Sequence, residues 1–99
     1  AAWDNAVAAI ERNDPRTRGI VVLGLDAPEA ELAASFALAA KQPLVKGFAV
    51  GRTIFGNAAR NWLAGNITAG EAVTEMVANY QRLCEIWDKA RSGAMEDAA

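Results

Sequence analysis

Two short apolar segments, residues 20–25 and 44–50, constrain the fold of this chain more than any other feature. The first reads Ile-Val-Val-Leu-Gly-Leu and shows no alternation of apolar and polar residues. That pattern is typical of a strand covered on both faces, as in a parallel sheet. The second, Leu-Val-Lys-Gly-Phe-Ala-Val, is predicted to be its neighbour. Each segment is followed by a sequence with helical periodicity.

Four helices are predicted around these strands. The first runs to Asn13, where Asp14-Pro15 stops it, and the second follows Pro28 and ends at Gln42-Pro43. The third covers 53–64, with Thr53 as N-cap and Gly65-Asn66 at its end. The fourth opens with the capping box Thr68–Glu71 and closes at Gly93. The tail 94–99 is expected to be flexible.

Apolar residues at helical spacing predict the buried side of each helix. In the first helix they are Trp3, Val7 and Ile10, and in the second Leu32, Phe36 and Ala40. In the third they are Ile54, Phe55, Ala58, Trp62 and Leu63. In the fourth they are Val73, Met76, Val77, Tyr80, Leu83, Cys84 and Trp87, with Cys84 interpreted as a core thiol.

Strands that alternate with helices indicate right-handed βαβ units and an α/β fold with a parallel sheet. Two strands leave two open edges and too little sheet for an independent domain. We therefore expect residues 1–99 to form a partial, incomplete domain. The missing strands would come from an upstream part of the polypeptide or from other copies of the chain, so an oligomer is expected. Ala1 in place of Met, directly before an amphipathic helix, also favours a segment of a longer protein.

Composition excludes several classes of function. The net charge is −2 and the basic residues are dispersed, so neither a nucleic-acid surface nor a basic membrane-binding face is indicated. No apolar run is long enough to span a bilayer, and no signal-peptide pattern opens the chain. The single cysteine, Cys84, fits a reducing cytoplasm. The absence of histidine removes Ser-His and Cys-His catalysis and histidine-based metal sites, and we expect no metal and no cofactor.

The ends of the two predicted strands carry the candidate site. Functional residues gather at the carboxyl ends of parallel strands, which here are Gly24-Leu25-Asp26 and Gly51-Arg52. Gly51 allows close approach of a ligand to the backbone, and the following helix offers free N–H groups. Arg52 adds a forked cation suited to phosphate. The alternative is that Gly51 is a packing glycine and Arg52 a solvated charge.

The alternation of side chains assigns each strand two faces. Gly47, Ala49 and Gly51 share one face, which is small and suits the inside of a barrel, whereas Phe48 and Val50 face the helices. Lys46 falls on the helix side, early in its strand, and is interpreted as a snorkelling lysine. Asp26 precedes Ala27-Pro28, so helix capping and ligand binding both stay open for it.

The stretches "RGIVVLGLDAP" and "VKGFAVGRTIFGNAARNWLAG" resemble the end of the aldolase-like domain appended to PfkB-type sugar kinases of bacterial myo-inositol catabolism. That domain is similar to class I (β/α)8 aldolases such as the tagatose-bisphosphate aldolases. The resemblance implies the last two βα units of a TIM barrel, with a flanking helix at each end. It also implies phosphate binding by Gly51, Arg52 and Thr53, and a substrate pocket that includes Gly24 and Asp26.

The function implied by the resemblance is aldol cleavage of 6-phospho-5-dehydro-2-deoxygluconate. The parent chain would also carry a 5-dehydro-2-deoxygluconate kinase. No catalytic residue is assigned to these 99 residues, because the Schiff-base lysine of class I aldolases lies on an earlier strand. The chain alone is therefore expected to be inactive. The alternative is a phospho-sugar-binding or oligomerisation module without catalysis.

Overall fold

The computed structural model describes the backbone of residues 2–98 and the side chains of residues 2–94. The elements follow the order α1 (Ala2–Asn13), β1 (Ile20–Leu23), α2 (Glu29–Ala39), β2 (Val45–Ala49), α3 (Arg52–Leu63) and α4 (Ala69–Ala98). The chain is elongated, with extents of 50 × 29 × 20 Å. The predicted α/β class and the order of elements are therefore confirmed.

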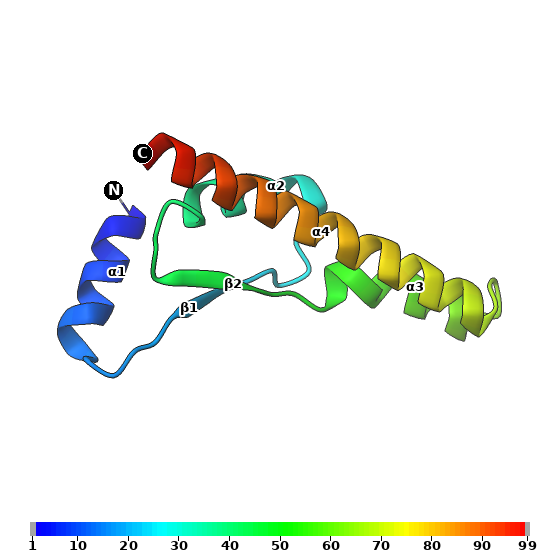
Figure 1. Ribbon diagram of the computed structural model, residues 1–99. Helices are drawn as coiled ribbons and strands as arrows, with labels where there is room; N and C mark the ends of the chain where they lie inside the picture. Colours follow the sequence, from blue (N-terminus) through cyan, green and yellow to red (C-terminus); the bar gives the residue numbers. More distant parts are fainter. Residues whose placement is uncertain (1, 99) are drawn as a thin grey trace.

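The two strands pair in parallel, as predicted (Figure 1). Val21 lies opposite Gly47 and Leu23 opposite Ala49, after an irregularity between Ile20 and Val21. Helix α2 makes the crossover from β1 to β2, which is the connection that parallel strands require. Both strands are shorter than the apolar segments that predicted them, because Gly24 to Asp26 turn away towards α2.

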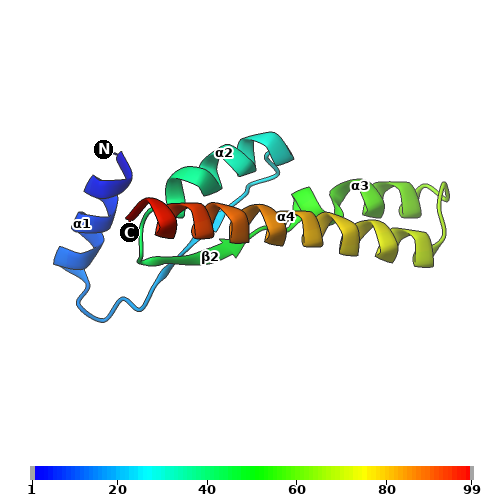
Figure 2. The ribbon, with the colours of Figure 1, turned by 45° about the horizontal axis from the view of Figure 1, so that its top comes forward.

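Helices α2 and α4 cover one side of the sheet (Figures 1 and 2). Phe36, at the centre of this core, is fully buried. Its ring stacks on Phe48 with centroids 4.9 Å apart and meets Trp87 edge-on at 5.6 Å. Such aromatic contacts each contribute about 0.5–1.5 kcal/mol beyond area burial. The predicted inner positions of α2, Leu32, Phe36 and Ala40, are all buried.

The other face of the sheet is not covered by any of the residues that the structure describes. Val21 and Leu23 point away from the helices, with 52% and 61% of their surfaces exposed. Their register partners Gly47 and Ala49 are small and leave this face shallow. The apolar runs predicted strands covered on both faces. In this chain only one face is covered, because both α2 and α4 pack on the same side.

Helices α3 and α4 form an antiparallel hairpin that extends beyond the end of the sheet (Figure 2). The turn between them is closed by a Schellman motif: the N–H of Asn66 donates to the carbonyl of Asn61 at 2.9 Å, and Gly65 takes φ +78°. The predicted capping box is also present. The N–H of Glu71 donates to Thr68 Oγ1 at 3.1 Å, and the N–H of Thr68 donates to Glu71 Oε1 at 3.0 Å.

Several residues predicted to be core are instead exposed on this hairpin. Only Ala58 of the predicted α3 stripe is fully buried, and Ile54 is partly buried. The exposed residues of the two predicted stripes are Phe55, Trp62, Leu63, Val73, Val77 and Tyr80. Cys84 is half-buried and lies outside the core cluster. The apolar stripes were predicted correctly, but no further layer of the described residues packs on them.

The predicted end of the last helix at Gly93 is wrong, since α4 continues to Ala98. Gly93 keeps helical geometry because helix formers flank it and one glycine costs only about 1 kcal/mol. The side chains of the last residues lie outside the described part of the chain. The flexibility of the tail 94–99 stays a prediction.

Candidate anion-binding site

The ends of β1 and β2 meet the start of α3 around an open hollow of about 590 Å³. Asp26 and Arg52, predicted at the ends of different strands, both line it. The β1–α2 loop contributes Asp26, Ala27 and Pro28, and α2 contributes Glu29. The other lining residues are Arg52, Thr53, Asn57 and Arg60 of α3 and Glu75, Ala78, Asn79 and Arg82 of α4. The hollow is thus rich in charged and amide side chains.

The β1–α2 loop reaches the hollow through a tight turn. Leu25 and Asp26 both take positive φ, 50° and 66°, and the N–H of Ala27 donates to the carbonyl of Gly24 at 2.9 Å. Two successive non-glycine residues in this region store strain of order 1 kcal/mol or more each. The turn places Asp26 in the hollow. The alternative capping role of Asp26 is wrong, because the N-cap of α2 is Pro28 and no side chain caps that helix.

The start of α3 presents backbone donors to the hollow. Its N-cap is Gly51, without a side-chain cap, and the N–H groups of Ile54 and Phe55 donate to the Gly51 carbonyl. The N–H groups of Arg52 and Thr53 belong to the first turn, which has no acceptor within its own helix. Together with the helix dipole, these groups favour an anion.

Thr53 is not the N-cap that the sequence predicted. It lies one residue inside α3, and its hydroxyl donates a hydrogen bond of 2.7 Å to the carbonyl of Ala27. The hydroxyl proton is therefore engaged with the β1–α2 loop. The backbone N–H of Thr53 is the group that stays available for the predicted phosphate contact.

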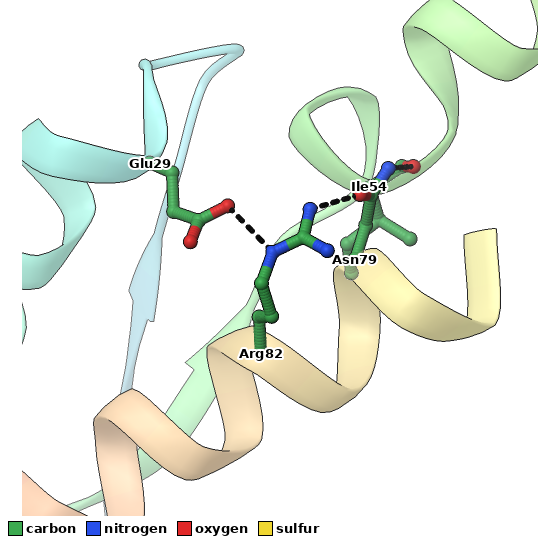
Figure 3. Close-up of polar contacts among 4 residues, drawn as sticks. All are labelled: Glu29, Ile54, Asn79 and Arg82. Atoms are coloured by element: carbon green, nitrogen blue, oxygen red, sulfur yellow. Dashed lines mark hydrogen bonds and ion pairs between the residues drawn. The ribbon is translucent and has the colours of Figure 1, made fainter. Parts of the chain in front are cut away.

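A chain of side-chain contacts joins the three helices around the hollow (Figure 3). Arg82 Nε lies 3.3 Å from Glu29 Oε2, and another nitrogen of Arg82 donates to Asn79 Oδ1. Asn79 in turn donates to the carbonyl of Ile54 at 2.8 Å. Glu29 and Arg82 are both about half exposed, so the ion pair alone adds little stability. The ion pair holds the Arg82 side chain in place and pairs its positive charge with Glu29.

Arg52 and Arg60 are the two arginines lining the hollow whose side chains are unpaired among the described residues. Among the described side chains of residues 2–94, the guanidinium groups of Arg52 and Arg60 make no hydrogen bond and no ion pair. The guanidinium of Arg60 folds back over Gly56, where a Cβ would lie 3.3 Å from Arg60 Nη1. Nearby Glu75 is engaged by Asn57 Nδ2 at 3.3 Å. Arg52 is the first residue of α3 and Arg60 lies in its last turn, so the unpaired guanidinium next to the helix N-terminus is that of Arg52.

Two of the predicted site glycines have packing contacts. A Cβ on Gly24 would lie 3.0 Å from both Val50 methyl groups, so this residue sits on the helix-covered side of the sheet. A Cβ on Gly51 would lie 3.0 Å from the Phe55 ring. Gly51 directly precedes Arg52, the first residue of α3 that lines the hollow, but does not line it itself. Gly24 is not among the residues that line the hollow.

The remaining candidates lie elsewhere. Lys46 is exposed, and its Nζ donates to the carbonyl of Pro43 at 3.1 Å, so its amino group does reach the surface as predicted. Cys84 neighbours Tyr80 one turn earlier on α4, and a hydrogen bond between these side chains raises the pKa of Tyr80. Neither residue lines the hollow.

Sequence reasoning missed Asn57, Arg60, Asn79 and Arg82. They come from the middle of two helices that meet only in the folded chain. A signal did exist for Arg60, since Gly56 four residues earlier is an unusual residue for a helix interior. None marked Asn79 or Arg82, whose partners lie on other helices.

Within the described part of the chain, no group of three or more His, Cys, Asp or Glu side chains is placed to hold a metal ion. None of the helices, as far as they are described, combines the length and apolar character needed to cross a bilayer.

The structure contains a parallel βαβ unit with a polar hollow at its strand ends, and the family of the chain follows from a sequence comparison. Residues 1–91 match the model of DUF2090, described as "Uncharacterized protein conserved in bacteria". The chain belongs to this bacterial family. No curated protein and no solved structure matches it.

Proposed function

We propose that the hollow at the start of α3 binds the phosphate group of a phosphorylated sugar acid. The observation that carries this proposal is the uncommitted guanidinium of Arg52 beside the unoccupied first-turn N–H groups of the same helix. A planar forked cation and converging N–H donors are the groups that bind phosphate. The Thr53–Ala27 hydrogen bond supports the proposal, because it holds the two strand-end loops together.

We further propose that the chain is the C-terminal part of a (β/α)8 aldolase-like domain. The parallel βαβ unit, the bare face lined by Gly47 and Ala49, and the two open strand edges support this. In such barrels a phosphate site commonly uses the loops after the last two strands and the N-terminus of an extra helix. On this proposal helix α3 would be that extra helix, since it follows β2 and precedes α4, the helix that packs back onto the sheet.

On this proposal the parent protein is a cytoplasmic enzyme of myo-inositol breakdown. It would cleave 6-phospho-5-dehydro-2-deoxygluconate, with a kinase domain that phosphorylates 5-dehydro-2-deoxygluconate. The imine-forming lysine would lie on an earlier barrel strand. The alternative is a phospho-sugar-binding module without catalysis, which the lack of a lysine in the hollow favours for this segment. A lysine at the end of the sixth barrel strand of the parent would decide for the enzyme.

Titration calorimetry on the parent protein tests the phosphate role. The phosphorylated sugar acid and its unphosphorylated counterpart are compared on wild type, Arg52→Ala and Arg52→Lys. Each charge-assisted hydrogen bond contributes roughly 1.5–3 kcal/mol. Arg52→Ala should therefore weaken the phosphorylated ligand about ten- to a hundredfold. Arg52→Lys should fall between the two, because it keeps the charge but loses the fork.

Arg18→Ala is the matched control, since Arg18 is an exposed arginine that precedes β1 at the other end of the strands. It should leave the affinity for both ligands unchanged. The proposal is wrong if Arg52→Ala preserves the preference for the phosphorylated ligand.

A further inference from the structure

The α3–α4 hairpin has two sides of opposite character. One side forms the hollow, to which α3 contributes Asn57 and Arg60 and α4 contributes Glu75 and Arg82. The other carries large apolar side chains that are between 43% and 58% exposed. We call this surface the apolar side of the hairpin; it consists of Phe55, Trp62, Val73, Val77 and Tyr80.

Helical geometry places these five residues together. On α4, Asn79 points at α3, so Ala78 turns towards the hollow and Tyr80 turns the opposite way. Val73 and Val77 precede Tyr80 by seven and three residues and extend its stripe.

On α3, Ala58 is fully buried and Asn57 turns towards the hollow. Phe55 and Trp62 lie on the other side of Ala58 around the helix and are seven residues apart, so they form one stripe. Because the helices are antiparallel and share the hollow on one side, the two stripes share the opposite side.

The apolar side is free of charge. The charged residues of the chain between positions 53 and 81 are Arg60, Glu71 and Glu75. Arg60 and Glu75 line the hollow, and Glu71 is engaged in the capping box with Thr68. A surface without charge meets no like-charge repulsion when it packs against a copy of itself. A two-fold interface brings the same surface of both copies together, so the lack of charge removes one obstacle to such a pairing.

The size of the surface also fits such an interface. A buried aromatic side chain contributes about 150–250 Å², so half-exposed Phe55, Trp62 and Tyr80 each still offer roughly 100 Å². With the two valines, the apolar side offers roughly 500 Å², against about 800 Å² in total that each partner buries in a standard interface. A polar rim supplies the remainder. Aromatic residues at the centre of the patch are typical interface hot spots.

We infer that the apolar side of the hairpin is a dimer interface, and that its occupant is the same surface of a second copy of the chain. Two hairpins then pack as a four-helix arrangement with the hollow of each copy facing outward. The anion site stays open in this dimer, because it lies on the opposite side of the hairpin.

Sedimentation equilibrium of the 99-residue chain tests this inference. The wild type should be a dimer at micromolar concentration. The double variant Trp62→Gln/Val77→Gln should weaken the dimer by thirtyfold or more, the effect of losing roughly 2 kcal/mol at a hot spot. Both side chains are about half exposed in the monomer, so the replacements should leave the circular dichroism spectrum unchanged.

The matched control is Val21→Gln/Leu23→Gln, which makes the same change on the bare face of the sheet. It should leave the dimer intact. A monomeric wild type overturns the inference, and so does a dimer that the sheet variant dissociates and the hairpin variant does not.

A second measurement needs no variant. Cys84 is the only cysteine and lies one turn beyond Tyr80 at the end of the stripe. Its rate of alkylation should fall as the protein concentration rises through the dimer dissociation constant. A rate independent of concentration contradicts the proposed interface even if the variants fail to fold.

Discussion

The hydroxyl of Thr53 donates to the carbonyl of Ala27 at 2.7 Å and joins two segments that are 26 residues apart in sequence. Ala27 belongs to the strained turn after β1, and Thr53 belongs to the first turn of α3, directly after β2. The bond is partly buried, so water competes for it only weakly. It thereby fixes Asp26 and Arg52 relative to each other across the hollow.

Replacing Thr53 by valine should loosen the site. The change keeps the shape of the side chain but leaves the Ala27 carbonyl without its donor, which costs about 1–3 kcal/mol. We expect urea unfolding to give a lower free energy of unfolding by that amount, and phosphate affinity to fall together with it. Thr53→Ser retains the hydroxyl and is the control. Equal stability of Thr53→Val and wild type would show that the bond does not hold the loops.

Replacing Arg91 should destabilise the connection between α2 and β2, which its side chain contacts. Its guanidinium donates to the carbonyls of Ala40, at 3.0 Å, and Val45, where α2 ends and β2 begins, and it lies 5.0 Å above the Trp87 ring. Hydrogen bonds from a charged donor contribute about 1.5–3 kcal/mol, and Arg91→Ala should lower the free energy of unfolding by at least that much. Thermal and urea unfolding measure the loss. The exposed neighbour variant Lys89→Ala should change little.

Because of the capping box of α4, the free energy of unfolding should depend on pH in the acidic range. Hydrogen bonds from the Thr68 backbone and hydroxyl hold the pKa of Glu71 below its ordinary value of 4.5. A lowered folded-state pKa stabilises the fold above the ordinary value, and this contribution is lost as the pH falls through the folded-state pKa. Unfolding measured above and below pH 4.5 should therefore show an acid loss that is smaller in Glu71→Gln. An identical acid loss in that variant would exclude Glu71 as its source.

Shortening Phe36 should have the largest effect of any change in the core. Its ring is fully buried between Phe48 and Trp87, so Phe36→Ala leaves a cavity and should cost about 3–5 kcal/mol. Leu38→Ala on the same helix is the comparison, because that side chain is 56% exposed. Denaturant unfolding should separate the two variants by several kcal/mol. Similar losses would mean that α2 does not pack as described.

Local chemistry made much of the fold predictable. Apolar segments without alternating polar residues predicted both strands and their parallel pairing. The capping box of Thr68 and Glu71 predicted the start of α4. Each of these signals acts within a few residues. The juxtaposition of Asp26 and Arg52 was also predictable, because parallel strands end at the same edge.

The predictions that failed are mainly those that depend on what packs against a given surface in the folded chain. Periodicity placed Trp62 and Tyr80 on apolar stripes, but a stripe does not reveal whether another layer lies on it. Thr53 looked like a cap because its true acceptor lies 26 residues away. Positive φ at Leu25 is equally invisible in the sequence, because the surrounding fold imposes a conformation that leucine disfavours; Asp26 beside it is a residue type that tolerates it.

The length of α4 has a consequence for the order in which the chain folds. Its first half is held by the capping box, the Schellman turn and contacts with α3, all of which close short loops. The sheet instead requires β1 to find β2 and both to find Leu83 and Trp87, at a much larger entropic cost of loop closure. We therefore expect the hairpin to form first and to present α4 as a preformed helix. On this order the sheet packs afterwards on the C-terminal half of α4. The hairpin would then be the folding nucleus for the part of the chain that carries the core.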